Sequence, residues 1–262
     1  MAIATGADGT TIHYEDHGGT GTNVVLVHGI TESSETWRPI TDRLIGKHRV
    51  VTLDLRGHGQ SGTADRYDLE AMAGDVVTVI TAIGMETPHI VGHSLGGAVV
   101  SAVGAAFPVA SIVNVDQSLQ LGSFKEQLSA VEAQLRDPEM FPLVIEGLFG
   151  QLAGPLAGTD EFARVNDARR PDQDVVLGVW EMIFAMSEDD IAAVVEGALA
   201  GYAGSAVPYL SLFGIDPGPE YATWLSAHIA TATVEVWADQ GHYPHLANPD
   251  KFVTRLEEFW YD

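Results

Sequence analysis

Short runs of consecutive apolar residues, separated by longer segments with helical periodicity, constrain the fold of this chain more than any other feature. A strand that is apolar at every position is buried on both faces, as in a parallel sheet between two layers of helices. Segments such as 36–45 and 69–83 carry the apolar stripe of helices that could supply those layers. The alternation predicts an α/β protein with a doubly wound, mostly parallel sheet. The expected central strands are 23–27, 49–53, 89–91, 111–115, 207–214 and 234–237.

The segment Gly92-His93-Ser94-Leu95-Gly96-Gly97 follows one of these apolar runs and precedes a segment rich in Ala, Gly and Val. This is the G-x-S-x-G pattern in its expected strand–turn–helix context. The turn is so sharp that only small residues fit two positions before and after the serine, which is held in a strained conformation above the sheet. The N-terminus of the following helix favours negative charge developing nearby. The pattern predicts that Ser94 is a nucleophile.

Taken with three further motifs, this pattern resembles the α/β-hydrolase superfamily, and in particular its serine hydrolases of the carboxylesterase and lactonase type. The other motifs, in family order, are His28-Gly29, the segment 54–61 (Asp-Leu-Arg-Gly-His-Gly-Gln-Ser) and Gly241-His242. The resemblance covers nearly the whole chain. It implies an α/β-hydrolase fold with a sheet of about eight strands and a helical cap inserted after strand 6.

The expected cap, or lid, comprises residues 118–206, which contain no convincing strand and are broken by several prolines. A stretch of about 90 residues is far longer than an ordinary crossover connection. Residues 1–117 and 207–262 are therefore expected to form the α/β-hydrolase core.

The resemblance also implies a histidine base and a carboxylate that orients it. Among ten histidines, His242 is favoured because it directly follows a glycine and lies just after a predicted strand, with His245 as the second choice. Two aspartates compete for the role of the acid. The chain order Ser…Asp…His favours Asp216, and Asp116, directly after the strand 111–115, is the alternative.

Two backbone amides are expected to form an oxyanion hole for the negative charge of an acyl-transfer transition state. The resemblance assigns one to Leu95, the residue after the nucleophile, and the other to Ile30 in the loop after the strand 23–27. Within the expected cap, Trp180 and Phe184 are candidates for an apolar substrate-binding pocket. Arg169-Arg170 is interpreted as a solvated pair, with binding of a substrate carboxylate as the alternative.

The composition excludes several other chemistries. The chain of 262 residues has no cysteine, so disulfides and thiolate nucleophiles are impossible, and no zinc-like ligand spacing or nucleotide fingerprint is present. The formal net charge of −23 disfavours nucleic acids and anionic membranes as partners. We expect a cytoplasmic protein, monomeric or homodimeric, that needs no metal or cofactor and acts on a small molecule.

A serine paired with a histidine favours acyl transfer through an acyl-enzyme. Esters and lactones of small to medium, uncharged, moderately hydrophobic compounds are the predicted substrates. Hydrolysis of a C–C bond beside a ketone is an alternative, since similar proteins cleave such bonds. A ligand receptor with little turnover and a cofactor-independent oxygenase on the same scaffold are further alternatives.

Overall fold

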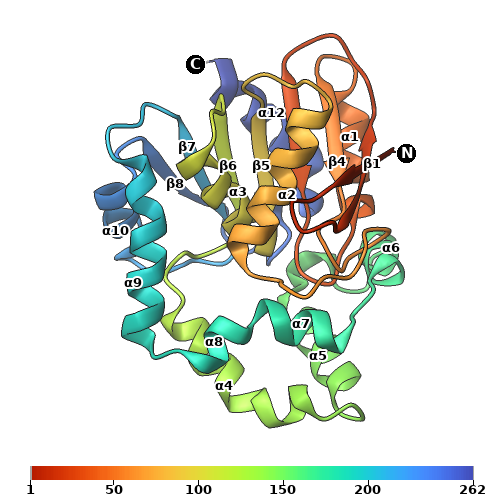
Figure 1. Cartoon of the computed structure of the whole chain (residues 1–262), viewed down its shortest axis with the longest axis vertical. Coiled ribbons are helices and arrows are strands. Elements are labelled where there is room, and N and C mark those ends of the chain that lie inside the picture. The colour runs from red at the N-terminus through yellow and green to blue at the C-terminus, as the bar shows by residue number, and fades with distance from the viewer. Residues whose placement is uncertain (1, 262) are drawn as a thin grey trace.

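In the computed structural model, which describes residues 2–261, eight strands form a single sheet in the order β1-β2-β4-β3-β5-β6-β7-β8 (Figure 1). The first two strands pair antiparallel with each other, and β2 pairs antiparallel with β4. All neighbours from β4 to β8 run parallel. This is the mostly parallel α/β-hydrolase sheet that the sequence predicts. The strands are β1 (Ala2–Thr5), β2 (Thr11–Asp16), β3 (Asn23–Val27), β4 (Arg49–Leu53), β5 (His89–His93), β6 (Ser111–Val115), β7 (Tyr209–Phe213) and β8 (Ala232–Val236).

Helices cover both faces of the sheet because alternate side chains of each central strand point to opposite sides. In β3, Val24 and Leu26 pack in one core cluster with α1 and α12, while Val25 and Val27 pack in another with α2 and α3. The central strands are therefore buried on both faces, which explains their continuous apolar runs. The helices of the core are α1 (Arg38–Leu44), α2 (Leu69–Ala82), α3 (Leu95–Ala106), α10 (Tyr221–His228), α11 (Pro244–Ala247) and α12 (Pro249–Tyr261).

Residues 118–206, here called the helical insertion, connect β6 to β7. Their first five helices lie beyond the end of the sheet at which the parallel strands finish (Figure 1). The last long helix, α9, instead runs back along the sheet and packs against α3. The helices of the insertion are α4 (Gly122–Arg136), α5 (Phe141–Leu152), α6 (Asp160–Ala168), α7 (Gln173–Val179), α8 (Glu181–Ala185) and α9 (Glu188–Leu199), with short 3-10 turns at Gly154–Leu156 and Ala200–Tyr202.

The loop after β4, residues 54–61, is held in place by hydrogen bonds and ion pairs of its own side chains. The Asp54 carboxylate accepts hydrogen bonds from the backbone amides of Ser34 (2.7 Å) and Gln60 (2.9 Å). The buried guanidinium of Arg56 makes a two-pronged ion pair with Asp75 on α2, at 2.6 and 2.8 Å. Residues 54–61 therefore tie the end of β4 to Ser34 on one side and to α2 on the other.

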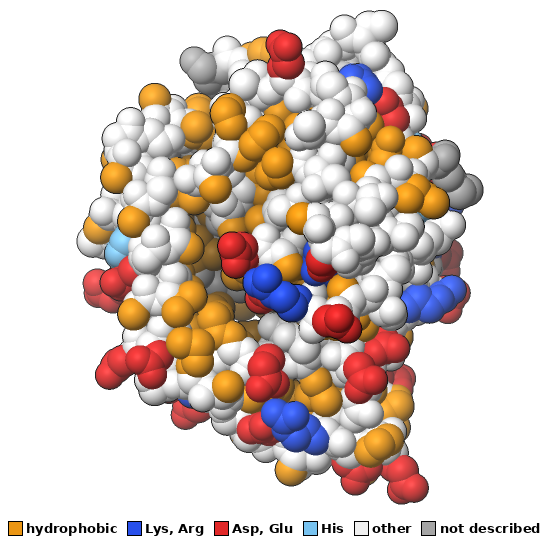
Figure 2. Space-filling model, in the orientation of Figure 1, with side chains coloured by type: hydrophobic (Ala, Val, Ile, Leu, Met, Phe, Trp, Pro, Cys, Tyr) orange, Lys and Arg blue, Asp and Glu red, His pale blue; other side chains and the backbone are white. Residues whose placement is uncertain are grey.

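The surface carries many more acidic than basic side chains, as expected for a formal net charge of −23. Figure 2 shows acidic side chains scattered over the helical insertion and apolar ones gathered around a hollow in the same face. No helix within residues 2–261 is both long and apolar enough to cross a membrane.

Buried histidines make the stability of this fold sensitive to acid. Burial, with a smaller contribution from His28, lowers the pKa of His58 from 6.5 to about 4. Between these two values the unfolded chain binds a proton that the folded chain excludes, so this contribution to stability is lost as the pH falls.

We predict that His58→Gln weakens this pH dependence. Between pH 7 and pH 5 the free energy of unfolding of the variant should fall by about 2 kcal/mol less than that of the unaltered protein. Urea unfolding at the two pH values measures the difference. Gln60→Ala, an exposed change in the same loop, is the control and should follow the unaltered protein. Parallel pH dependences for His58→Gln and the unaltered protein would contradict the prediction.

Candidate active site

Ser94 occupies the sharp turn between β5 and α3 in a conformation that few residues adopt, with φ 51° and ψ −125°. Its amide donates a hydrogen bond to the carbonyl oxygen of Val115 on the neighbouring strand (2.9 Å). The glycines around it are sterically required. A Cβ atom on Gly92 would lie 2.1 Å from the carbonyl oxygen of Gly96, and one on Gly96 would lie 2.3 Å from that of Val27. The half-buried serine side chain is thus fixed at the end of β5.

His242 and Asp116 form a buried hydrogen-bonded pair next to this turn. Nδ1 of His242 lies 2.6 Å from Oδ2 of Asp116. The other oxygen, Oδ1, accepts hydrogen bonds from the backbone amides of Gly214 (2.6 Å) and Ile215 (3.0 Å), which fix the carboxylate. His93, the residue before the serine, donates from Nε2 to the carbonyl oxygen of His242 (2.8 Å). This bond ties the loop of the predicted base directly to the turn of the predicted nucleophile.

The sequence favours Asp216 as the carboxylate partner of His242, and the structure shows a different partner. Asp216 is exposed, and its Oδ1 accepts a hydrogen bond from the amide of Gly218 (2.8 Å) in a local turn. The alternative residue, Asp116, is the carboxylate that contacts the histidine.

The second-choice histidine, His245, lies in the core of the protein. It is fully buried, and its ring packs 4.7 Å from Trp37 and 4.6 Å from His93 between centroids. Neither ring nitrogen has a hydrogen-bond partner among the described residues. Burial, together with the neighbouring charge of His93, lowers its pKa well below 6.5. These features suit a neutral packing residue rather than a base.

The loop after β3, residues 28–33, lies against the serine turn. A Cβ atom on Gly29 would approach Ser94 Cβ to 3.1 Å. Ile30 follows it and is buried, and Leu95 is the first residue of α3, so its amide has no carbonyl one turn earlier in the helix to bond. His28 fixes the loop at its start, because its Nε2 accepts from the amide of Leu55 (3.0 Å). Of the two residues predicted for the oxyanion hole, Leu95 directly follows the serine, and Ile30 directly follows Gly29, which lies against it.

A buried charged cluster behind this loop was not predicted from the sequence. Glu32 is 2% exposed and accepts from the amide of Gly29 (3.1 Å), from Nδ1 of His93 (3.3 Å) and from Arg169 (3.3 Å). The interpretation of Arg169 as a solvated residue is wrong, because its guanidinium is buried and also bonds the hydroxyls of Thr31 and Tyr243. Burial alone would raise the pKa of Glu32, but the charges of His93 and Arg169 outweigh it and hold that pKa well below 4.5.

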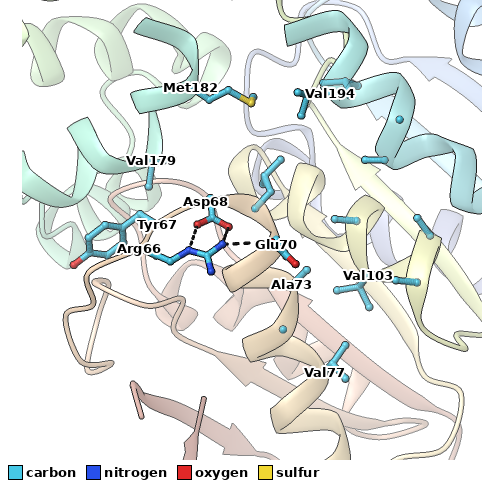
Figure 3. A pocket seen from close by; sticks show the side chains of 18 of the residues that line it. Arg66, Tyr67, Asp68, Glu70, Ala73, Val77, Val103, Val179, Met182 and Val194 are labelled. Atoms are coloured by element: carbon cyan, nitrogen blue, oxygen red, sulfur yellow. Dashed lines mark hydrogen bonds and ion pairs between the residues drawn. The ribbon is translucent and has the colours of Figure 1, made fainter. Parts of the chain in front are cut away.

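A cavity of about 1230 Å³ lies between α2 and α3 on one side and α7, α8 and α9 on the other (Figure 3). Its walls are apolar, with Met182 and Val194 facing Val103 across the space, and ion pairs between Arg66 and Asp68 mark its rim (Figure 3). Ser94 and His242 are not among its lining residues.

Trp180 and Phe184, the two predicted pocket residues, do not line this cavity either. Trp180 is buried edge-to-face against Phe124 at 6.0 Å between ring centroids. Phe184 lies under the guanidinium of Arg136 at 5.2 Å. The structure thus shows both side chains packing within the insertion.

The described residues do not assemble a site for a metal ion. Across positions 2–261, no three His, Cys, Asp or Glu side chains come close enough together to hold one. The candidate site consists of a serine after β5, a carboxylate after β6 and a histidine in the loop after β8.

An eight-stranded sheet of this order with a serine at the strand–helix turn defines an α/β hydrolase. Residues 24–255 match the Alpha/beta hydrolase family, and the chain belongs to it. It is 26% identical over 270 residues to an uncharacterized Mycobacterium tuberculosis protein, covering 92% of this chain and 76% of that protein.

Two solved structures illustrate the range of this fold. A candidate aryl esterase from Burkholderia cenocepacia is similar with a TM-score of 0.71 and 25% identity, over 98% of this chain and 97% of the other. The Cif epoxide hydrolase from Acinetobacter nosocomialis has a TM-score of 0.80 at 21% identity, over 98% and 88%. The second likeness shows the fold alone.

The close approach of backbone atoms at Gly96 predicts that adding one methyl group there lowers the stability of the fold. Gly96→Ala should lower the free energy of unfolding by about 3 kcal/mol or more, because the backbone atoms that it meets cannot move aside. Gly197→Ala on α9 is the matched control, since a Cβ atom there meets nothing within 4 Å. That change should raise stability by about 0.5–1 kcal/mol. Thermal and urea unfolding measure both, and equal stabilities of the two variants would refute the steric argument.

Proposed function

We propose that this protein is a serine hydrolase that cleaves a carboxylic ester or lactone through an acyl-enzyme on Ser94. The observation that carries the proposal is the 2.6 Å bond between His242 and Asp116, formed beside a serine held in a strained turn. Strained non-glycine residues cluster where geometry serves a function. Three of the five described here, namely Thr31, Ser94 and Asp116, lie around this site.

Asp116 decides which nitrogen of His242 can act. A carboxylate only accepts hydrogen bonds, so Nδ1 of the histidine must carry the hydrogen that it donates to Asp116. In the neutral ring Nε2 is then the free acceptor, and it is the atom that takes the proton from the hydroxyl of Ser94. The negative charge of Asp116 also stabilises the imidazolium that this transfer creates.

The reaction proceeds in two halves. Ser94 Oγ attacks the substrate carbonyl as His242 accepts its proton, and the amides of Ile30 and Leu95 hold the oxygen as it becomes negative. His242 returns the proton to the departing alcohol oxygen, which leaves an ester between the acyl group and Ser94. In the second half water attacks that ester as His242 accepts its proton. His242 then gives the proton to Ser94 Oγ, which restores the serine and releases the carboxylic acid.

The substrate class follows from the surroundings of the site. A surface with a formal net charge of −23 repels anions, which favours small to medium, uncharged, moderately hydrophobic substrates. The similarity to a candidate aryl esterase supports an ester as the substrate. Serine argues against direct displacement on an epoxide, for which similar hydrolases use an aspartate at this position.

We further propose that the helical insertion acts as a lid, and that the protein works in the cytoplasm as a monomer or homodimer without a nucleic-acid or membrane partner.

The proposal predicts a specific order of damage among three variants. With a panel of p-nitrophenyl esters and aromatic lactones, Ser94→Ala should be the most damaging change and lower kcat by about a million-fold. Asp116→Asn should lower it by up to about 10,000-fold, because an amide favours the wrong tautomer of His242. Asp216→Asn removes the same charge from an exposed loop and should leave kcat within about twofold.

Two results would contradict the proposal. Full activity in Ser94→Ala would show that the serine is not the nucleophile. Tight binding of the panel by the unaltered protein without turnover would favour a ligand receptor.

A further inference from the structure

The Glu32 cluster, comprising Glu32, His93 and Arg169 with the hydroxyls of Thr31 and Tyr243, joins four separate parts of the chain. Glu32 belongs to the loop after β3, His93 to the end of β5, Tyr243 to the loop after β8, and Arg169 to the end of α6 in the helical insertion. The three charged or ionisable side chains are all less than a tenth exposed. The cluster therefore connects the helical insertion to three parts of the core through buried polar contacts.

The two carboxylate oxygens of Glu32 have different partners within the cluster. Oε1 accepts from the Arg169 guanidinium at 3.3 Å, and Oε2 faces Nδ1 of His93 at 3.3 Å. Nε2 of His93 faces a carbonyl oxygen, which also only accepts hydrogen bonds. The ring of His93 thus lies between two acceptors, the Glu32 carboxylate and the carbonyl oxygen of His242. Transferring a charged side chain from water to the protein interior costs free energy. Buried charged groups are therefore found where hydrogen bonds to their partners are complete.

Glu32 also holds the backbone that forms the predicted oxyanion hole. The oxygen that faces His93 accepts the amide hydrogen of Gly29, the residue directly before Ile30. Arg170 of the insertion donates its own amide to the carbonyl oxygen of Thr31, the residue directly after Ile30 (2.9 Å). The position of the Ile30 amide is therefore set by bonds on both sides, one of them made by the insertion.

We propose that Glu32 is a positioning residue and that its buried ion pair with Arg169 lets the helical insertion set the geometry of the oxyanion loop. This inference rests on the proposed function for its effect on catalysis. The insertion also reaches the predicted base, because the carbonyl oxygen of Leu152 accepts the amide hydrogen of His242 (2.9 Å). The insertion is thus attached to both the oxyanion loop and the base loop, and a substrate that displaces it would disturb both.

Arg169→Met tests the link, and Arg164→Met is its matched control. Arg164 lies on α6 in the same insertion and also touches the core, donating to the carbonyl oxygen of Glu35 (2.7 Å). Hydrogen exchange measured by mass spectrometry reports on residues 29–33 whether or not the protein turns over substrate. We expect exchange in this segment to accelerate at least about 10-fold in Arg169→Met and to stay unchanged in Arg164→Met.

Kinetics on the p-nitrophenyl ester that is turned over best supply the second readout. Loss of an oxyanion donor's position weakens the transition state and not substrate binding, so kcat should fall about 10-fold or more while KM changes less than about threefold. Arg169→Lys retains a buried cation for Glu32 but loses the fork to Thr31 and Tyr243. It should give intermediate exchange and kcat, and it keeps the test open if Arg169→Met does not fold.

The outcomes separate the two proposals. Unchanged exchange in residues 29–33 in the folded Arg169 variants would overturn the link. Faster exchange with an unchanged kcat would overturn the positioning role of Glu32. Absence of turnover in the unaltered protein would count against the hydrolase proposal alone, because the exchange result would still decide the link.

Discussion

The turn at Ser94 is the constraint on which the rest of this structure depends. Its backbone is strained, and α3 packs so closely on the end of β3 that a Cβ atom on Gly96 would lie 2.3 Å from the carbonyl oxygen of Val27 and 2.6 Å from that of His28. The strand beside β5 must therefore be β3, and the loop leaving β3 must pass the serine. The same turn bonds the end of β6 through the amide of Ser94. Three strand ends thus meet at one point, and each contributes one part of the site.

The sequence predicts most of the fold because its strongest signals are local. Continuous apolar runs indicate strands that are buried on both faces. The glycines around Ser94 indicate a sharp turn that few other residues could form. The pattern of apolar residues does not predict how the helices of a long insertion pack on the core. Its last helix, α9, packs against α3 instead of lying over the strand ends, because contacts between distant segments leave little trace in a local periodicity.

The choice between Asp116 and Asp216 shows why the site is harder to predict than the fold. Strands β6 and β7 are neighbours, with Val115 opposite Leu212, so both aspartates follow strands that end at the same edge of the sheet. Chain order cannot separate them. What separates them is the backbone, since Asp116 has a positive φ directly after its strand, while Asp216 lies farther out in an exposed turn. Glu32 was not predicted for a similar reason. Its burial depends on contact with Arg169, which lies 137 residues farther along the chain, and a local sequence pattern does not indicate such a contact.

The unequal distribution of charge connects the fold to the kind of substrate it favours. The chain has 13 Lys and Arg against 36 Asp and Glu, and two of its few arginines are buried. Arg56 neutralises Asp75, and Arg169 neutralises Glu32. Each of these buried cations is paired with a buried carboxylate, so the whole excess of negative charge stays on the rest of the protein, where it repels anions. An ester or lactone carries no charge until it reacts. In the proposed reaction, negative charge develops on it only in the transition state, beside the amides predicted for the oxyanion hole and the helix N-terminus at Ser94, which stabilise such charge.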